Sequence, residues 1–433
     1  MPFCEEISTN RVVCVLSLGK KWPKRIVGSA LTWTAVLLLW GGCGAKTGLE
    51  VGDAEVDGGV DAPSDAGLPC IELPIDGGPI DLPLDTEVQL AKADVFFLLD
   101  ITASMREEIE QIKQNLRNRI VPGIRQTIPS AYLGVGTFAD FPIPPCGEPG
   151  DLPFRLVVPI TNDVTRVQAA LNLIQTTLGR DHPEAQVEAL YQVATGEGRP
   201  PFVSPAIGCP QGGFGYPCFR EDALSIIMLI TDAPFHNGPR GTHPYLCSLP
   251  VRPATYADAL RVLQARGIRV MGLNSGDEES RADLEIIAKD TGAVDNGRPI
   301  VFDIGPTGSR LTAGIIDAIR VLARVIELDI DVVLVDPVPG DGVDPTRFVE
   351  RVIPLRAEPM SGVGSIDLEA GVFRRVRTGT RVVFRLILQG GVVAPGRGPQ
   401  RFLLEVVFRG DGRQRLGSRM IEIVVPGADG SGC

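Results

Sequence analysis

Two acidic residues follow apolar segments that are typical of buried strands, and hydroxyl groups lie close to the first of them. Asp100 ends the run ADVFFLLD, Thr102 and Ser104 follow at alternate positions, and Asp232 follows the later run SIIMLIT. Carboxylates and hydroxyls are hard oxygen donors, which suit Mg2+ or Mn2+. The four residues predict a divalent-metal site that retains positive charge and attracts an anionic ligand; helix capping by Thr102 or Ser104 is the alternative.

The segments around these residues predict an α/β domain. Between residues 93 and 326, short apolar runs alternate with helical patterns, as in a mostly parallel sheet covered by helices on both faces. In such sheets, ligands bind beyond the carboxyl ends of the strands, where Asp100 and Asp232 lie. The predicted strands are 93–100, 132–138, 154–160, 225–231, 268–273 and 300–304.

Apolar residues at steps of three and four predict amphipathic helices between these strands. The first helix follows Ser104, and the others lie near residues 257–263 and 315–326. The residues that carry the first pattern are Ile109, Ile112, Leu116, Ile120 and Ile124.

The order of these motifs resembles the von Willebrand factor A (VWA) fold and its metal-ion-dependent adhesion site. The resemblance covers roughly residues 91–327 and is closer to the I-like domain of integrin β subunits. It rests on the strand-end motif DITAS at 100–104 and on four further features. These are the acidic pair Glu107 and Glu108, GVGTFAD at 134–140, GRDHPEA at 179–185 and TDAPFH at 231–236.

The resemblance implies three neighbouring metal sites. The principal site takes Mg2+ or Mn2+, and its implied ligands are Asp100, Thr102, Ser104, Glu184 and Asp232. A synergistic site is implied at Asp140, Asp181 and Glu184, and an adjacent site, with Ca2+ as an option, at Glu107 and Glu108.

Two departures from the family pattern affect the outer sites. Gly179 stands where the family has an Asn ligand, which removes an oxygen from the synergistic site. Glu107 and Glu108 stand where the family has aspartates, so each side chain is longer by one methylene.

Catalysis has no positive support in the sequence. The three histidines, His182, His236 and His243, do not form a His-Glu-x-x-His motif, although a hydrolytic metal site that includes them is an alternative. No Gly-x-Ser-x-Gly or Walker-type phosphate loop is present. We therefore expect a binding protein and not an enzyme.

The N-terminal segments predict export and anchoring. Residues 1–42 have the layout of a lipoprotein signal peptide, with basic residues before an apolar run, and LWGGC resembles a lipobox with Cys43 as the lipid-modified residue. A membrane-spanning helix is the alternative. Residues 43–90 carry eleven acidic residues and one basic residue and predict an extended acidic tether, with a calcium-binding repeat as the alternative.

Six cysteines follow Cys43, and an even number in an exported chain predicts up to three disulfides. The bond that we prefer joins Cys209 to Cys218 across the loop CPQGGFGYPC, and zinc binding is a weaker alternative. The other cysteines are Cys70, Cys146, Cys247 and Cys433.

After residue 327 the helical pattern ends, and β-prone segments predict a small all-β, sandwich-like domain over 328–433. The net charge of −11 disfavours nucleic acid as a partner, which would require a basic face. The chain is therefore expected to be a cell-envelope lipoprotein, at the outer membrane or cell surface, that binds a protein or glycoprotein by metal-dependent adhesion. The partner's carboxylate would complete the metal shell. The rival is a structural envelope component whose metal stabilises the fold.

Overall fold

The computed structural model describes residues 68–74, 77–340 and 342–433. The predicted signal peptide, the lipid attachment at Cys43 and the first part of the predicted tether lie outside the described residues. None of the described helices is both long enough and apolar enough to span a membrane.

The central domain is built on a six-stranded sheet in the order β10-β7-β6-β3-β4-β5. Its strands are β3 (Lys92–Asp100), β4 (Ser130–Phe138), β5 (Arg155–Thr161), β6 (Leu224–Thr231), β7 (Arg269–Asn274) and β10 (Val301–Asp303). All neighbours are parallel except β4 and β5. No helix separates β4 from β5, so the chain turns back along the edge of the sheet.

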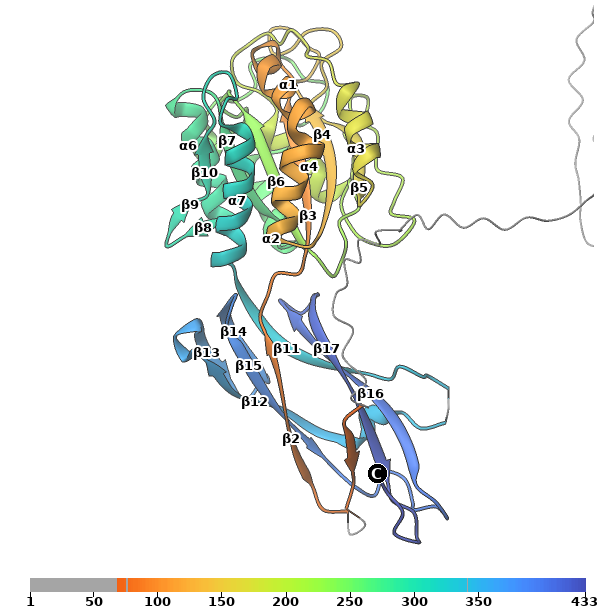
Figure 1. Ribbon diagram of the computed structural model, residues 1–433. Helices are drawn as coiled ribbons and strands as arrows, with labels where there is room; N and C mark the ends of the chain where they lie inside the picture. The colour runs from red at the N-terminus through yellow and green to blue at the C-terminus, as the bar shows by residue number, and fades with distance from the viewer. Residues whose placement is uncertain (1–67, 75–76, 341) are drawn as a thin grey trace, which may run out of the picture. The chain divides into compact units, whose positions relative to one another are not determined.

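Along the chain, helices separate the parallel strands, and in space they lie against the sheet, as expected (Figure 1). Every residue of β6 is buried, which requires cover on both faces because successive side chains point to opposite sides. Helix α7 packs against both α1 and α2, and α4 packs against α5. The helices are α1 (Arg106–Asn115), α2 (Val121–Thr127), α3 (Val164–Asn172), α4 (Gln186–Thr195), α5 (Tyr256–Ala265), α6 (Glu278–Asp290) and α7 (Leu311–Val325).

The first predicted helix is interrupted by a π-helical segment, Leu116–Ile120, between α1 and α2, and all five apolar residues that predicted it are buried. Short 3-10 turns occupy Ala103–Met105 and Pro239–Gly241 in this domain, and Pro345–Phe348 and Met360–Gly362 later in the chain. A small hairpin pairs β8 (Val294–Asp295) with β9 (Arg298–Pro299).

The glycines of the motif GVGTFAD are required by packing. A Cβ atom at Gly134 would lie 2.8 Å from the ring of Phe96, and one at Gly136 would lie 2.7 Å from it. The two glycines therefore let β4 accommodate this ring beside β3, and this pairing positions the ends of both strands.

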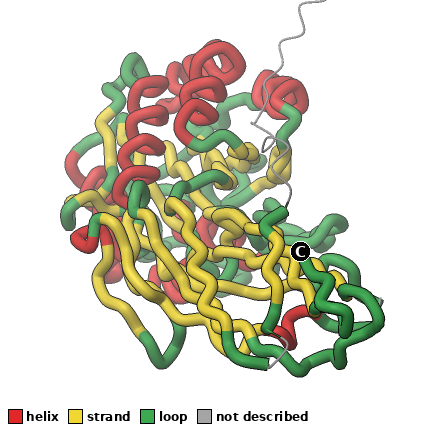
Figure 2. Tube along the Cα trace, turned by 60° about the horizontal axis from the view of Figure 1, so that its bottom comes forward, coloured by secondary structure: helices red, strands yellow, loops and turns green. Residues whose placement is uncertain are grey.

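The second domain contains a six-stranded and a three-stranded sheet, and its regular structure is almost entirely strand (Figure 2). Phe384 of the smaller sheet lies between Phe373 and Phe408 of the larger, with ring centroids 5.0 Å and 6.1 Å away. This face-to-face packing confirms the predicted sandwich-like fold. The strands from the C-terminal part of the chain are β11 (Glu327–Val335), β12 (Val349–Glu358), β13 (Val363–Asp367), β14 (Val372–Arg377), β15 (Arg381–Leu388), β16 (Gln400–Gly410) and β17 (Gln414–Val425).

Part of the predicted tether belongs to this second domain, which corrects the expectation for residues 70–87. β1 (Cys70–Glu72) pairs with β17, and β2 (Ile80–Glu87) pairs with β15 along its whole length. The sequence of β2 alternates apolar and polar residues, and Pro83 is tolerated because β2 is an edge strand. The α/β domain is therefore inserted between strands of the β domain.

Among the described residues, three disulfides join Cys70 to Cys433, Cys146 to Cys247 and Cys209 to Cys218. The last pair confirms the predicted loop closure. Disulfides on this scale are typical of chains that fold outside the reducing cytosol.

Candidate metal centre

The carboxyl ends of β3 and β6 bring the predicted ligands together. Asp100 is fully buried at the end of β3. The backbone N–H and the hydroxyl of Thr102 donate to its Oδ1 at 2.9 Å and 2.7 Å, and the Thr231 hydroxyl donates to its Oδ2 at 2.7 Å. These three hydrogen bonds fix the orientation of the Asp100 carboxylate.

Ser104 and Asp232 add further oxygens beside Asp100. The Ser104 hydroxyl lies 3.3 Å from that of Thr102. Burial raises the pKa of the Asp232 carboxyl, and Ser104 opposes part of that shift. Behind Asp232, Gly276 passes so close that a Cβ atom there would lie 1.9 Å from the Asp232 carbonyl oxygen. Gly276 was not among the residues expected at the site, since its role depends on a close approach that no local motif signals.

Glu184 lies near Asp100 on a loop whose backbone hydrogen-bonds to the segments that follow β4 and β6. Its N–H donates to the Pro234 carbonyl at 3.0 Å, and its own carbonyl accepts from the His236 N–H at 2.8 Å. The following N–H, of Ala185, donates to the Ala139 carbonyl at 3.0 Å. These backbone bonds hold the loop against the segments that follow β4 and β6.

The electrostatics of this cluster favour a cation. Burial, and then the charge of Asp232, raise the pKa of Asp100 to about 7. Burial, and then the charges of Asp100, Asp140 and Asp181, raise the pKa of Glu184 well above its usual value. Glu184 Oε2 is buried without a hydrogen-bond partner among the described residues. Buried carboxylates without enough donors are the oxygen set that a divalent ion would stabilise.

The two acids of the implied adjacent site differ in their surroundings. Glu107 is exposed at the start of α1, whereas Glu108 is 1 % exposed and its Oε2 has no hydrogen-bond partner among the described residues. Burial, and then the charge of Asp232, raise the pKa of Glu108 to about 7, although a hydrogen bond from Ser275 opposes this shift. Of the two acids, Glu108 is therefore the one buried beside the acidic cluster, whereas Glu107 is exposed to solvent.

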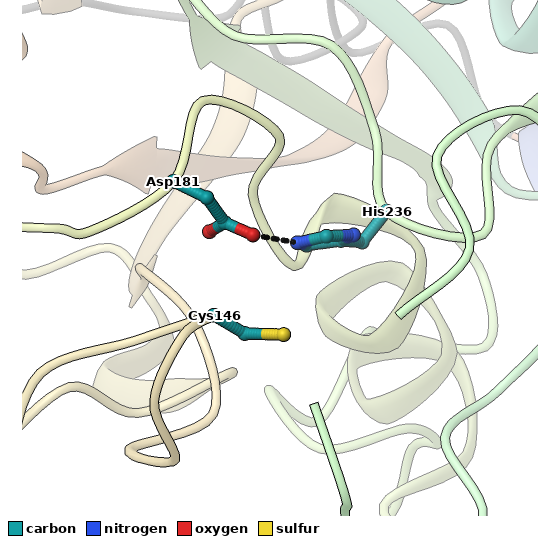
Figure 3. A group of neighbouring side chains, drawn as sticks. All are labelled: Cys146, Asp181 and His236. Atoms are coloured by element: carbon teal, nitrogen blue, oxygen red, sulfur yellow. Dashed lines mark hydrogen bonds and ion pairs between the residues drawn. The ribbon is translucent and has the colours of Figure 1, made fainter. Parts of the chain in front are cut away.

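Asp140 and Asp181 lie together as implied, but a histidine lies between them. His236 Nε2 is 3.1 Å from Asp140 Oδ2 and 3.1 Å from Asp181 Oδ2. Figure 3 shows Asp181 and the ring of His236 pointing toward each other, with Cys146 nearby. The Cys146 sulfur is bonded to Cys247, so it cannot serve as a thiolate ligand.

The three histidines have separate partners. His182 is largely exposed, with Nε2 3.8 Å from Asp277 Oδ2, and His243 Nε2 lies 2.8 Å from Glu279 Oε1. His236 alone lies among the implied ligands. The hydrolytic cluster considered from the sequence is therefore not assembled by the described residues.

These pKa shifts predict how the stability of the metal-free protein depends on pH. Folded Asp100 and Glu108, each with a pKa of about 7, retain protons that the unfolded chain loses near pH 4. Because the folded state binds more protons over that range, the free energy of unfolding decreases as the pH rises from about 4 to about 7. Thermal melts in EDTA should show a lower Tm at pH 8 than at pH 5. Saturating Mg2+ should reduce that difference. If Mg2+ raised the Tm by the same amount at pH 5 and at pH 8, the assignment would be contradicted.

Comparisons with known proteins place the sequence similarity in this domain. Residues 91–199 match the family model "Integrin beta chain VWA domain". Integrin beta-6 from Homo sapiens is 24 % identical over 162 residues, which cover 34 % of this chain and 18 % of the relative. Integrin beta-6 from Mus musculus is 23 % identical over a match of the same extent. The chain thus spans under a fifth of the length of these relatives.

Two solved structures show more remote similarity. A von Willebrand factor type A protein from Catenulispora acidiphila aligns with a TM-score of 0.35 and 11 % identity, covering 83 % of this chain and 73 % of that one. Proximal thread matrix protein 1 (PTMP1) from the mussel byssus aligns with a TM-score of 0.33 and 14 % identity, covering 58 % and 51 %.

Proposed function

We propose that the α/β domain, whose sequence is similar to the VWA domain of integrin β chains, binds a protein or glycoprotein partner through a divalent cation. The proposed ligands of Mg2+ or Mn2+ are Asp100, Thr102, Ser104, Glu184 and Asp232. An acidic side chain of the partner would complete the shell. Glu108 is the better candidate for an adjacent cation, Ca2+ included, because Glu107 is exposed.

One observation carries this proposal: a fully buried Asp100 faces two hydroxyls and two further acids at one edge of the sheet. A bound cation supplies positive charge that attracts an anionic partner group. The residues of the chain hold the oxygens in place: Thr102 and Thr231 orient Asp100, and the Ser104 hydroxyl lies beside that of Thr102. The hydroxyls of Thr102 and Ser104 would add no further negative charge to the ion's shell.

The proposed setting is the cell envelope. The predicted signal peptide and the lipid attachment at Cys43 would anchor the chain at the outer membrane or cell surface of a bacterium, and the three disulfides agree with a non-cytosolic location. The rival function is a structural component whose metal stabilises the fold. The elevated pKa values of Asp100 and Glu184 favour that rival as well, since a cation would relieve both.

A capture experiment separates the two functions. Wild-type protein and Ser104→Ala are immobilised separately, exposed to the same envelope extract in Mg2+, and eluted with EDTA. We expect a partner in the wild-type eluate that is reduced at least about tenfold with Ser104→Ala, equivalent to about 1.4 kcal/mol. Ser418→Ala, in the β domain, is the matched control and should behave as wild type. If Mg2+ raises the Tm of the wild-type protein but no protein elutes in an EDTA-dependent way, the structural rival is favoured.

A further inference from the structure

His236 is a buried histidine that contacts two carboxylates from two different loops. It is 2 % exposed, and its Nε2 lies at the same distance, 3.1 Å, from Asp140 Oδ2 and Asp181 Oδ2. Asp181 Oδ2 is the hydrogen-bond partner of Nε2, and Asp140 Oδ2 lies at the same distance from it. The imidazole thus lies at the point where the resemblance implies that a synergistic metal ion joins these two acids.

Both nitrogens of the ring have polar neighbours. Nδ1 lies 3.0 Å from the backbone carbonyl oxygen of His243, which can only accept, so Nδ1–H donates. Nε2 lies 3.1 Å from one carboxylate oxygen of Asp140 and from one of Asp181. The ring therefore occupies the space beside both acids.

The surroundings hold the ring in this position. The Tyr245 ring stacks on the imidazole with centroids 4.1 Å apart and planes 23° apart, and Phe141 packs edge-on against Tyr245 at 5.4 Å. The disulfide between Cys146 and Cys247 joins the loop after β4 to the loop after β6, and these loops supply Phe141 and Tyr245. The imidazole cannot leave without breaking the stack.

The residue at position 179, where the family has an Asn ligand, also disfavours a metal ion between Asp140 and Asp181. Gly179 has φ +67°, and a Cβ atom there would lie 3.2 Å from Thr102 Cγ2 and 3.4 Å from Glu184 Oε1. The loop thus lies against Thr102 and Glu184 with little room for a side chain. A metal between Asp140 and Asp181 would lie against the His236 ring and would lack the oxygen that the family places at position 179.

We propose that the His236 side chain replaces the synergistic metal ion by bridging Asp140 and Asp181, so that this chain binds one cation fewer than the resemblance implies. The bridge holds the Asp181 loop beside the strand ends, and Glu184 remains available to the principal site alone. The inference deepens the proposed function and rests on it for the assignment of Glu184 as a ligand of the principal site.

Anomalous diffraction from Mn2+ co-crystals tests this proposal, with Mn2+ binding counted in parallel by equilibrium dialysis. The wild-type protein should show no anomalous peak between Asp140 and Asp181. His236→Asn removes the bridging ring and offers an amide oxygen, so we expect a peak there and one additional bound Mn2+ per chain. His243→Asn is the control, because His243 contacts the exposed Glu279, lies at a positive φ that Asn tolerates and keeps its backbone carbonyl.

A Mn2+ ion between Asp140 and Asp181 in the wild-type crystals would overturn the proposal without any need for the variant. A folded His236→Asn that binds no additional Mn2+ would also overturn it, and circular dichroism establishes the fold. The anomalous Mn2+ peak expected among Asp100, Ser104 and Asp232 reports on the proposed principal site and is evaluated independently. If that peak is absent and the space between Asp140 and Asp181 is also empty in wild type, the proposed function fails but the role of His236 stands.

Discussion

The Asp100→Asn variant is expected to lose affinity for Mg2+ and Mn2+ by about 100-fold or more. Removal of a hydrogen-bond partner of a metal ligand typically reduces metal affinity about 10- to 100-fold, and loss of a charged ligand should exceed that. Asn keeps the shape of Asp100, so the hydrogen bond from Thr102 to Oδ1 can persist. Isothermal titration calorimetry of both proteins with Mn2+ measures the difference.

The same substitution should raise the stability of the metal-free protein at pH 8. Asp100 is fully buried near Asp232 and Glu184, so its negative charge is unfavourable above its pKa of about 7. An amide removes that charge, and the Tm in EDTA should rise. Asp317→Asn, an exposed site on α7 with the same change of charge, should alter neither quantity. Unchanged Mn2+ affinity in Asp100→Asn would show that Asp100 is not a ligand.

The Arg220→Ala variant is expected to lose about 3–5 kcal/mol of folding stability, because it leaves a buried charge without its partner. Asp94 is fully buried, and Arg220 Nε donates to its Oδ1 at 2.7 Å. The guanidinium also lies 3.6 Å from the ring centroid of Tyr132 and donates to the carbonyls of Ala93 and Ser130. Urea or thermal unfolding of the variant measures the loss.

Two comparisons test the reason for that loss. Asp94→Asn combined with Arg220→Met removes both charges and should recover part of the stability, as expected for a buried pair. Arg125→Ala removes an exposed arginine and should have little effect. Because Asp94 lies near the start of β3 and Asp100 at its end, folded Arg220→Ala should bind Mn2+ as wild type does. A loss no greater than that of Arg125→Ala would contradict the argument.

Much of the candidate metal centre could be predicted from local sequence, because parallel strands end at a common edge of the sheet. The apolar runs before Asp100 and Thr231 are long enough to be buried, and strand pairing brings their ends together wherever the helices lie. The hydroxyls at 102 and 104 follow within one turn, so they cannot be far from Asp100. The same local logic predicted the Cys209–Cys218 disulfide, which closes a short loop.

Other features depend on contacts between residues far apart in the chain. The alternation in Ile80–Glu87 is a strand signal, but only pairing with β15, about 300 residues later, provides the buried face that stabilises it. Without that partner, the acidic composition favours an extended segment, which explains the incorrect expectation for the tether.

The sequence by itself determined which residue types gather at the strand ends, because hydrophobic periodicity and strand direction are local properties. Only the tertiary structure decided how each acid is used. Glu107 and Glu108 are equivalent in sequence, yet helix packing buries one and exposes the other. His236 follows Asp232 by four residues, yet it reaches Asp140 and Asp181 only because three loops converge there. Burial and the donors available at that meeting point set which groups the two carboxylates contact.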